Sequence, residues 1–154
     1  SDVYKRQIHT ELAAKHVQTI CSGAPFVLAG DWNITPNSAT YKLLTTGQLS
    51  KDDPSYPTPK YNMEWEPTIE AMRSAYAESN FGEPDFTNYA RIKEEDPFID
   101  TLDYIFLSKE WNVVDVKKIP KRQDANGPFP NAVEPSDHVV IAATLELVAG
   151  ATDE

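Results

Sequence analysis

The feature that most constrains the fold is an unbroken apolar run, Phe26 to Ala29, that ends abruptly in the sequence Gly30-Asp31-Trp32-Asn33. A short run of this kind predicts a strand that is buried on both faces of a sheet. An amphipathic helix is predicted before it, from Ile8 to Cys21, because apolar residues such as Leu12 and Ile20 recur at helical spacing. A helix beside a buried strand is therefore expected in the first part of the chain.

A second helix is predicted after the run. Thr35 suits its N-cap, Pro36 its first helical position and Gly47 its C-terminal stop. Residues 50–67 are polar and rich in proline, which predicts an irregular loop. Residues 69–76 suit a further short helix.

The second half of the chain has the composition of strands. Aromatic and β-branched residues are frequent in the segments 85–90, 101–108, 111–117 and 138–147. A long loop, residues 118–135, separates the last two segments. The order of helix, strand, helix and then mainly strands predicts an α/β or α+β layered domain.

Length and composition narrow the class of protein. A chain of 154 residues is long enough for one domain with a core and too short for two. The single cysteine, Cys21, excludes an internal disulfide framework and fits a reducing compartment, so we expect an intracellular protein. No apolar run approaches the ~20 residues of a membrane-spanning helix, and no membrane partner is expected. We expect residues 1–7 to be a non-native or truncated segment, residues 8–148 to form the domain and residues 149–154 to be a tail.

The formal net charge of −10 bears on the partner. It opposes non-specific binding of nucleic acid, which depends on Lys and Arg at phosphates. It does not exclude a phosphate-ester substrate, because an acidic site that binds a divalent cation presents positive charge where a phosphate sits.

Three short segments carry residues suited to chemistry. In the first, Asp31 and Asn33 follow the predicted buried strand, although such residues are more often turn formers. In the second, Asp103 is an acid inside an apolar strand, either an edge acid that reaches solvent or a carboxylate that orients a histidine. In the third, Asp137 offers a hard oxygen ligand and His138 titrates near neutrality, although such a pair is also a common hydrogen-bonded turn. Strand ends can bring these side chains together across the fold.

These segments resemble, in order and approximate spacing, the last three motifs of the exonuclease–endonuclease–phosphatase superfamily: Gly30-Asp31-Trp32-Asn33, Leu102-Asp103-Tyr104-Ile105 and Ser136-Asp137-His138. Two further segments, Phe86-Thr87-Asn88-Tyr89 and Pro36 to Tyr41, are similar to its deadenylase, nocturnin and Angel group. The resemblance covers the chain from Ile8 onward. It implies the C-terminal half of a four-layer α/β/β/α sandwich, with two sheets face to face and helices outside.

The resemblance also implies a role for each matching residue. Asp31 would align or deprotonate the attacking water, and Asn33 would bind the substrate phosphate or position that water. His138 would bind the phosphate and stabilise charge in the transition state, with Asp103 orienting its imidazole. These four residues are the predicted catalytic set.

Metal and substrate residues follow from the same resemblance. Asp137 would belong to the acidic cluster that binds Mg²⁺ or Mn²⁺, and Phe86 and Asn88 would contact the nucleotide base. The principal metal-binding glutamate of the family lies in an N-terminal half that we expect to be missing here. Since magnesium usually needs one or two carboxylates plus substrate phosphates, we expect this chain by itself to be inactive or nearly so.

Three functions compete. The leading prediction is a metal-dependent hydrolase of phosphate esters that acts on RNA as a deadenylase-like 3′-exonuclease, monomeric when intact. A phosphatase or phosphodiesterase acting on a small nucleotide agrees better with the acidic charge. A catalytically inactive interaction module is the third, and the retention of an acid predicted to lie beside His138 argues against it.

Overall fold

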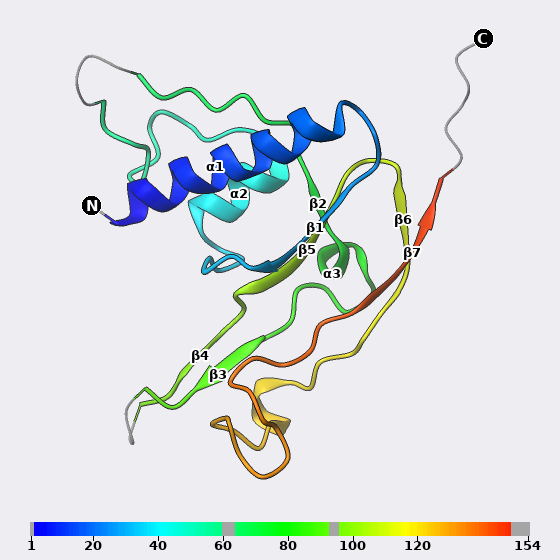
Figure 1. The fold of residues 1–154 in the computed structure, drawn as a ribbon. Helices are drawn as coiled ribbons and strands as arrows, with labels where there is room; N and C mark the ends of the chain where they lie inside the picture. The colour runs from blue at the N-terminus through cyan, green and yellow to red at the C-terminus, as the bar shows by residue number, and fades with distance from the viewer. Residues whose placement is uncertain (1, 60–63, 93–95, 149–154) are drawn as a thin grey trace.

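The computed structural model describes residues 2–59, 64–92 and 96–148. Figure 1 shows α1 and α2 side by side over the central strands, with the paired strands β6 and β7 at the far edge of the molecule. The elements are, in chain order, α1 (Asp2–Cys21), β1 (Val27–Asp31), α2 (Ala39–Thr46), β2 (Arg73–Ser74), α3 (Ala75–Glu78), β3 (Asn88–Ala90), β4 (Phe98–Asp100), β5 (Asp103–Leu107), β6 (Trp111–Val116), the 3₁₀ turn η1 (Arg122–Asp124) and β7 (Ala143–Leu147).

Strand β5 is the centre of the fold. It pairs antiparallel with β1 on one edge and with β2 on the other. Tyr104 and Phe106 face a core that includes side chains of α1 and α2. Ile105 and Leu107 face a second core, built with α3 and the paired strands β6 and β7. All four side chains are buried. An apolar layer therefore lies on each face of β5.

Strand β1 is more exposed than the sequence predicts. Val27 keeps 43% of its surface accessible, and Leu28 is the only residue of β1 that is half-buried. The reason is its place in the sheet, because β5 is its only neighbour among the described strands. The prediction that residues 26–29 form a strand is confirmed, and the prediction that both of its faces are buried is wrong.

Helix α1 begins earlier and packs through a different face than predicted. It starts at Asp2, so residues 2–7 belong to it, and whether they are native stays a prediction. Leu12 and Ile20 are exposed, whereas Gln7 and Glu11 are buried. The buried face is polar partly because it meets the backbone of a loop: the amide N of Thr68 donates to Glu11 Oε1 at 3.5 Å.

Helix α2 is confirmed with a different start. Ser38 is its N-cap, and the Ser38 hydroxyl accepts from the backbone N of Tyr41 at 3.1 Å. Thr35, the predicted N-cap, instead accepts the backbone N–H of Ser38 and closes the preceding turn. Gly47 ends the helix as predicted, with φ of 72°. A Cβ there would lie 2.8 Å from the carbonyl oxygen of Ile69, so this position requires glycine.

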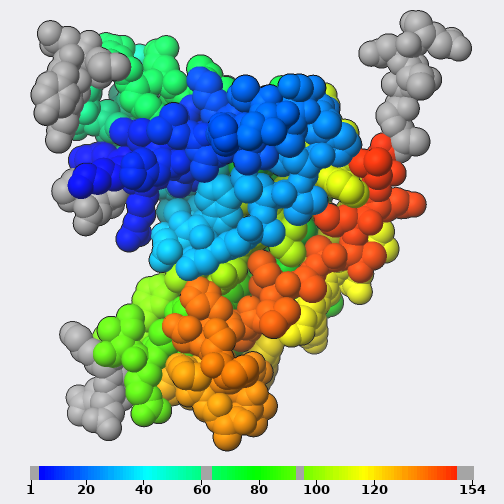
Figure 2. Space-filling model, in the orientation of Figure 1, coloured from blue at the N-terminus to red at the C-terminus, as the bar shows by residue number. Residues whose placement is uncertain are grey.

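The predicted strands of the second half are present but shorter, and β4 was not predicted. The predicted helix over residues 69–76 is wrong in its start, because residues 73–74 pair with β5 before α3 begins. Within the described ranges, no helix has both the length and the hydropathy that crossing a bilayer requires. Figure 2 shows the loop of residues 118–135, yellow to orange, gathered beside the green β3–β4 region. This loop brings the segment around His138 onto β3.

Candidate active site

Two carboxylates meet where β1 ends and β5 begins. The antiparallel register places Asp31 directly opposite Asp103, so both side chains point to the same face of the sheet. Asp31 also shapes the turn that follows it. Its Oδ1 accepts the backbone N–H of Asn33 at 2.8 Å, and its Oδ2 accepts the side-chain amide of Asn33 at 3.3 Å. Asn33 has φ of 52°, a left-handed conformation that asparagine tolerates well.

His138 lies between these carboxylates. Its Nδ1 is 2.8 Å from Asp103 Oδ2, and its Nε2 is 4.0 Å from Asp31 Oδ2. Burial lowers the pKa of His138, but the hydrogen bond to Asp103 and the charges of Asp103, Asp31 and Asp137 raise it more, so the pKa lies above its ordinary value. The imidazole is 31% exposed, which leaves it accessible to a ligand. The site therefore holds an accessible imidazole between two carboxylates, and the pKa of that imidazole is raised.

Strand β3 holds the His138 segment in place. The backbone N of Tyr89 donates to the carbonyl of Asp137 at 2.8 Å, and the backbone N of Val139 donates to the carbonyl of Thr87 at 2.8 Å. Asn88 and His138 form an antiparallel bridge between these bonds. This pairing brings His138 to Asp103, although 35 positions separate the two in sequence.

Asp137 is the candidate metal ligand. Its Oδ2 accepts one long hydrogen bond, 3.4 Å from Asn88 Nδ2. Asp103 Oδ2 is already engaged by His138 and by the hydroxyl of Thr87. Over residues 2–59, 64–92 and 96–148, no group of three or more His, Cys, Asp or Glu side chains is arranged to hold a metal ion. The hard oxygens of Asp137 thus fit one carboxylate ligand of a magnesium-like ion, and they do not make a complete site.

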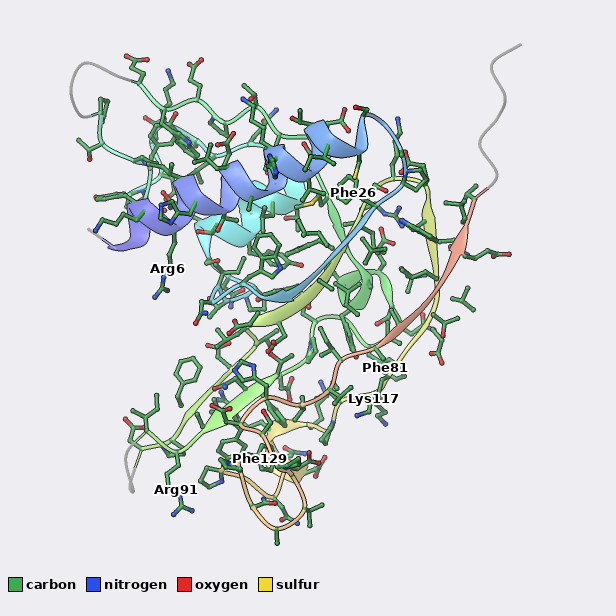
Figure 3. All side chains as sticks on the ribbon, viewed as in Figure 1. Arg6, Phe26, Phe81, Arg91, Lys117 and Phe129 are labelled. Carbon is green, nitrogen blue, oxygen red and sulfur yellow. The ribbon has the colours of Figure 1, made fainter. Side chains whose placement is uncertain are left out.

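The two predicted base-contacting residues are both buried. Phe86 is fully buried, with ring centroids 5.9 Å from Tyr89 and 6.5 Å from Phe129. Phe129 lies beside β3 (Figure 3), where its segment pairs with Ala90. The ring of Phe86 is therefore enclosed by packing aromatics, and its contact with a base stays a prediction. Asn88 points its amide at Asp137, and its contact with a base stays a prediction.

Sequence reasoning missed three residues that support the site. Thr87 binds Asp103 through its hydroxyl, and it lies inside a segment already singled out for its resemblance. The hydroxyl of Tyr104, next to Asp103 in sequence, donates to the carbonyl of Ile34 at 2.9 Å and supports the loop after Asn33. Arg6 extends from α1 (Figure 3) and donates to the carbonyl of Asn33 at 3.2 Å. No sequence signal marks Arg6.

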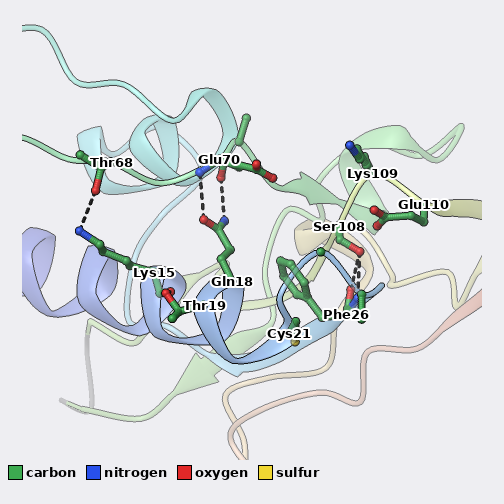
Figure 4. Close-up of a pocket in the computed structure, with 13 residues that line it drawn as sticks. Lys15, Gln18, Thr19, Cys21, Phe26, Thr68, Glu70, Ser108, Lys109 and Glu110 are labelled. Carbon is green, nitrogen blue, oxygen red and sulfur yellow. Dashed lines mark hydrogen bonds between the residues drawn. The ribbon is translucent and has the colours of Figure 1, made fainter. Parts of the chain in front are cut away.

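A cavity of about 380 Å³ lies elsewhere in the molecule. The C-terminal part of α1, Phe26 and residues 108–110 line it, as Figure 4 shows. Because β1 and β5 are antiparallel, these residues are at the opposite end of the strand pair from Asp31 and Asp103. The cavity is therefore separate from the candidate active site.

A family model described as Endonuclease/Exonuclease/phosphatase family matches residues 1–138. The 2′,5′-phosphodiesterase 12 of Mus musculus is 27% identical over 93% of this chain and 24% of its own length. Carbon catabolite repressor protein 4 homolog 4 of Arabidopsis thaliana is 34% identical over 79% of this chain and 27% of its own length. The CCR4-Not complex 3′-5′-exoribonuclease subunit Ccr4 of Aspergillus oryzae is 30% identical over 77% of this chain and 16% of its own length. The chain spans about a quarter or less of these relatives.

Two solved structures share the fold. The human Nocturnin catalytic domain has a TM-score of 0.56 at 22% identity and covers 92% of this chain and 41% of its own. An endonuclease/exonuclease/phosphatase from Bacteroides vulgatus has a TM-score of 0.55 at 23% identity, over 92% of this chain and 44% of its own. These likenesses confirm the predicted α/β fold class, of which the chain covers a part.

Proposed function

The chain belongs to the endonuclease/exonuclease/phosphatase family, and on this premise we propose that it carries the Asp31–His138–Asp103 part of the active site of a metal-dependent phosphate-ester hydrolase. The proposed substrate is RNA, cleaved at its phosphodiester bonds from the 3′ end as a deadenylase does. Relatives named as a 3′-5′-exoribonuclease and as a 2′,5′-phosphodiesterase support this choice. The observation that carries the proposal is the position of His138, bound to Asp103 and facing Asp31.

Each residue has a role that its contacts support. Asp31, oriented by both amide groups of Asn33, accepts a proton from the attacking water or aligns that water. His138 keeps Nδ1 on Asp103 and presents Nε2 to a phosphate oxygen, where a protonated ring stabilises developing negative charge. Asn33 contacts the same phosphate or the water through its side chain. His138 and Asp31 thus divide charge stabilisation and proton transfer between them.

Nucleases of this family generally depend on a divalent metal ion. We place Asp137 among the ligands of that ion, Mg²⁺ or Mn²⁺, which when bound neutralises charge on the substrate phosphate. Magnesium is commonly held by one or two carboxylates with waters and substrate phosphates. Because the described residues hold no complete ligand group, we place the remaining carboxylate outside them.

The test is hydrolysis of a 5′-labelled oligoadenylate by the full-length protein, with Mg²⁺ and with a chelator, beside the 154-residue chain and the variants Asp31→Asn and His138→Gln. Metal-dependent, stepwise shortening from the 3′ end that both variants abolish would support the proposal. The chain by itself should show little activity. Failure of the wild-type protein to cleave the RNA would reject the RNA substrate.

A small nucleotide phosphate is the second candidate substrate. The net charge of −10 favours it, because long nucleic acids are usually bound by surplus Lys and Arg. Release of inorganic phosphate or of a mononucleotide from small nucleotides, with oligoadenylate left intact, would select this candidate. Inactivity on both substrate classes would favour an interaction module.

A further inference from the structure

The hydroxyl of Thr87 has all of its hydrogen-bonding capacity in use. The backbone N–H groups of Leu102 and Asp103 donate to Thr87 Oγ1 at 2.9 and 3.0 Å. A threonine hydroxyl has two acceptor lone pairs and one proton. With both lone pairs occupied, the single proton is directed to Asp103 Oδ2, which lies 2.6 Å away. The side chain of Thr87 is fully buried, so water does not compete for these bonds.

This arrangement restrains the Asp103 carboxylate. Oδ2 receives the hydroxyl of Thr87 and also contacts Nδ1 of His138 at 2.8 Å. A carboxylate only accepts hydrogen bonds, so Nδ1 must carry the proton of this pair. Nε2, on the other side of the ring, then faces Asp31. The backbone carbonyl of Thr87 also binds the backbone N of Val139, so one residue contacts both the carboxylate and the histidine segment.

We propose that Thr87 is a positioning residue, whose hydroxyl holds the Asp103 carboxylate in the orientation that keeps Nδ1 of His138 protonated and leaves Nε2, which donates once the ring takes up a second proton, for the substrate phosphate. As a statement about catalysis, this rests on the proposed function. As a statement about the tautomer of His138, it concerns this chain alone.

The direct test is the tautomer of His138, read from the ¹⁵N shifts of the imidazole in the labelled chain at a pH where the ring is neutral. His9 and His16, both exposed on α1, serve as internal references, and His138→Gln assigns the signal. The wild-type chain should show the Nδ1–H form as the dominant species. A dominant Nε2–H form would overturn the proposal without any variant.

Two substitutions then isolate the hydroxyl. Thr87→Val keeps the shape and removes the hydroxyl, and the His138 signal should move to the tautomer mixture of His9 and His16. Thr87→Ser keeps the hydroxyl and should retain the wild-type tautomer. A folded Thr87→Val chain with the wild-type tautomer would contradict the role of Thr87. If valine prevents folding, the wild-type chain still tests the role of Thr87. A Thr87 hydroxyl proton that is protected from exchange supports its hydrogen bond to Asp103, and the absence of such a proton rejects that bond.

The turnover number of the enzyme is the second measurement that tests the role of Thr87. In the full-length protein, Thr87→Val should lower kcat by about 10-fold or more with KM unchanged, as removal of a residue that orients a functional histidine commonly does, and Thr87→Ser should restore kcat. An unchanged kcat in Thr87→Val would contradict the catalytic part of the proposal. If the wild-type protein hydrolyses no phosphate ester, the proposed function fails, and the tautomer still decides the structural part.

Discussion

The two ends of the β1–β5 strand pair are built on opposite physical principles. At one end the register sets Asp31 opposite Asp103, and like charges directly opposite each other destabilise a sheet. At the other end Ser108 bonds both backbone groups of Phe26 through its hydroxyl, and Trp111 Nε1 donates to the carbonyl of Phe26 at 3.0 Å. One strand pair therefore combines an end under electrostatic strain, at Asp31 and Asp103, with an end whose polar groups are hydrogen-bonded, at Phe26 and Ser108. We call these the strained end and the satisfied end.

The difference shows where function and stability reside. The strained end persists because neighbouring elements supply compensating partners, the Thr87 hydroxyl and the His138 imidazole. Arg73 stabilises the satisfied end, because its guanidinium donates to the carbonyls of Ser108 and Trp111 and pairs with Glu78. We infer that substitutions at the first end mainly change activity, whereas substitutions at the second end mainly change stability.

The largest expected effect is that of Asp31→Asn at the strained end. Turnover of the full-length protein should fall by about 10²–10⁴-fold, the usual contribution of a positioned acid or base. The free energy of unfolding should stay the same or rise by up to about 1 kcal/mol, since one of two opposed charges is removed. Turnover assays and urea unfolding measure the two quantities. Asp115→Asn, an exposed carboxylate on β6, is the matched control and should change neither.

Arg73→Ala at the satisfied end should have the opposite profile. Loss of the hydrogen bonds to main-chain carbonyls should lower the free energy of unfolding by about 2–3 kcal/mol, and we assign little of this to the partly exposed pair with Glu78. Turnover at a temperature where the variant is folded should be unchanged. Arg91→Ala, at an exposed arginine, is the control. A loss of turnover without a loss of stability would contradict the inference that substitutions at this end mainly change stability.

Trp111→Phe tests a single bond at the satisfied end. The substitution removes the hydrogen bond from Nε1 to the carbonyl of Phe26 and keeps most of the ring. The free energy of unfolding should fall by about 1 kcal/mol, again without a change in turnover. Thermal unfolding followed by circular dichroism is sufficient, and an unchanged stability would show that the remaining bonds from Ser108 satisfy this carbonyl.

Glu83 lies at neither end of the β1–β5 strand pair. We expect the smallest effect here, a change in how stability depends on pH. Burial raises the pKa of Glu83, while hydrogen bonds from Ser74 and Tyr41 lower it less. Between the unfolded and folded pKa values the native state binds more protons, so the free energy of unfolding falls as pH rises through this interval. Glu83→Gln should flatten that dependence, as unfolding measured at several pH values will show. An equally steep profile in the variant would assign the dependence to other groups.

The sequence predicted features that depend on residues close together in the chain, and it failed for features that depend on contacts between distant segments. Gly47 ends α2 as expected, because the left-handed conformation at a helix end is a local requirement. Ser38 replaced Thr35 as the N-cap because both residues suit a cap and the turn between them decided which one served. The exposed Leu12 and the buried Glu11 on α1 were beyond prediction, since the face that a helix buries depends on its neighbours.

The candidate site shows the same division. Residue type and position marked its acids and its histidine as suited to chemistry but left turn-forming roles open, and the family resemblance implied their catalytic roles. The structure brings Asp31, Asp103 and His138 together. Phe86 shows what the sequence leaves open, because an aromatic residue suits both stacking on a base and packing in a core, and in the structure its ring packs against Tyr89 and Phe129. The roles of these residues in catalysis stay predictions for the experiments above.

The sequence by itself determined which chemical groups the chain offers, their order, and most of the strands and helices around them. Only the tertiary structure decided which residues meet: that Asp103 binds His138, that Thr87 fixes Asp103, and that β5 is the strand buried on both faces. The reason is physical. Local propensity depends on the residue and its near neighbours, whereas burial and hydrogen-bond partners depend on the strand order and register that assemble distant segments.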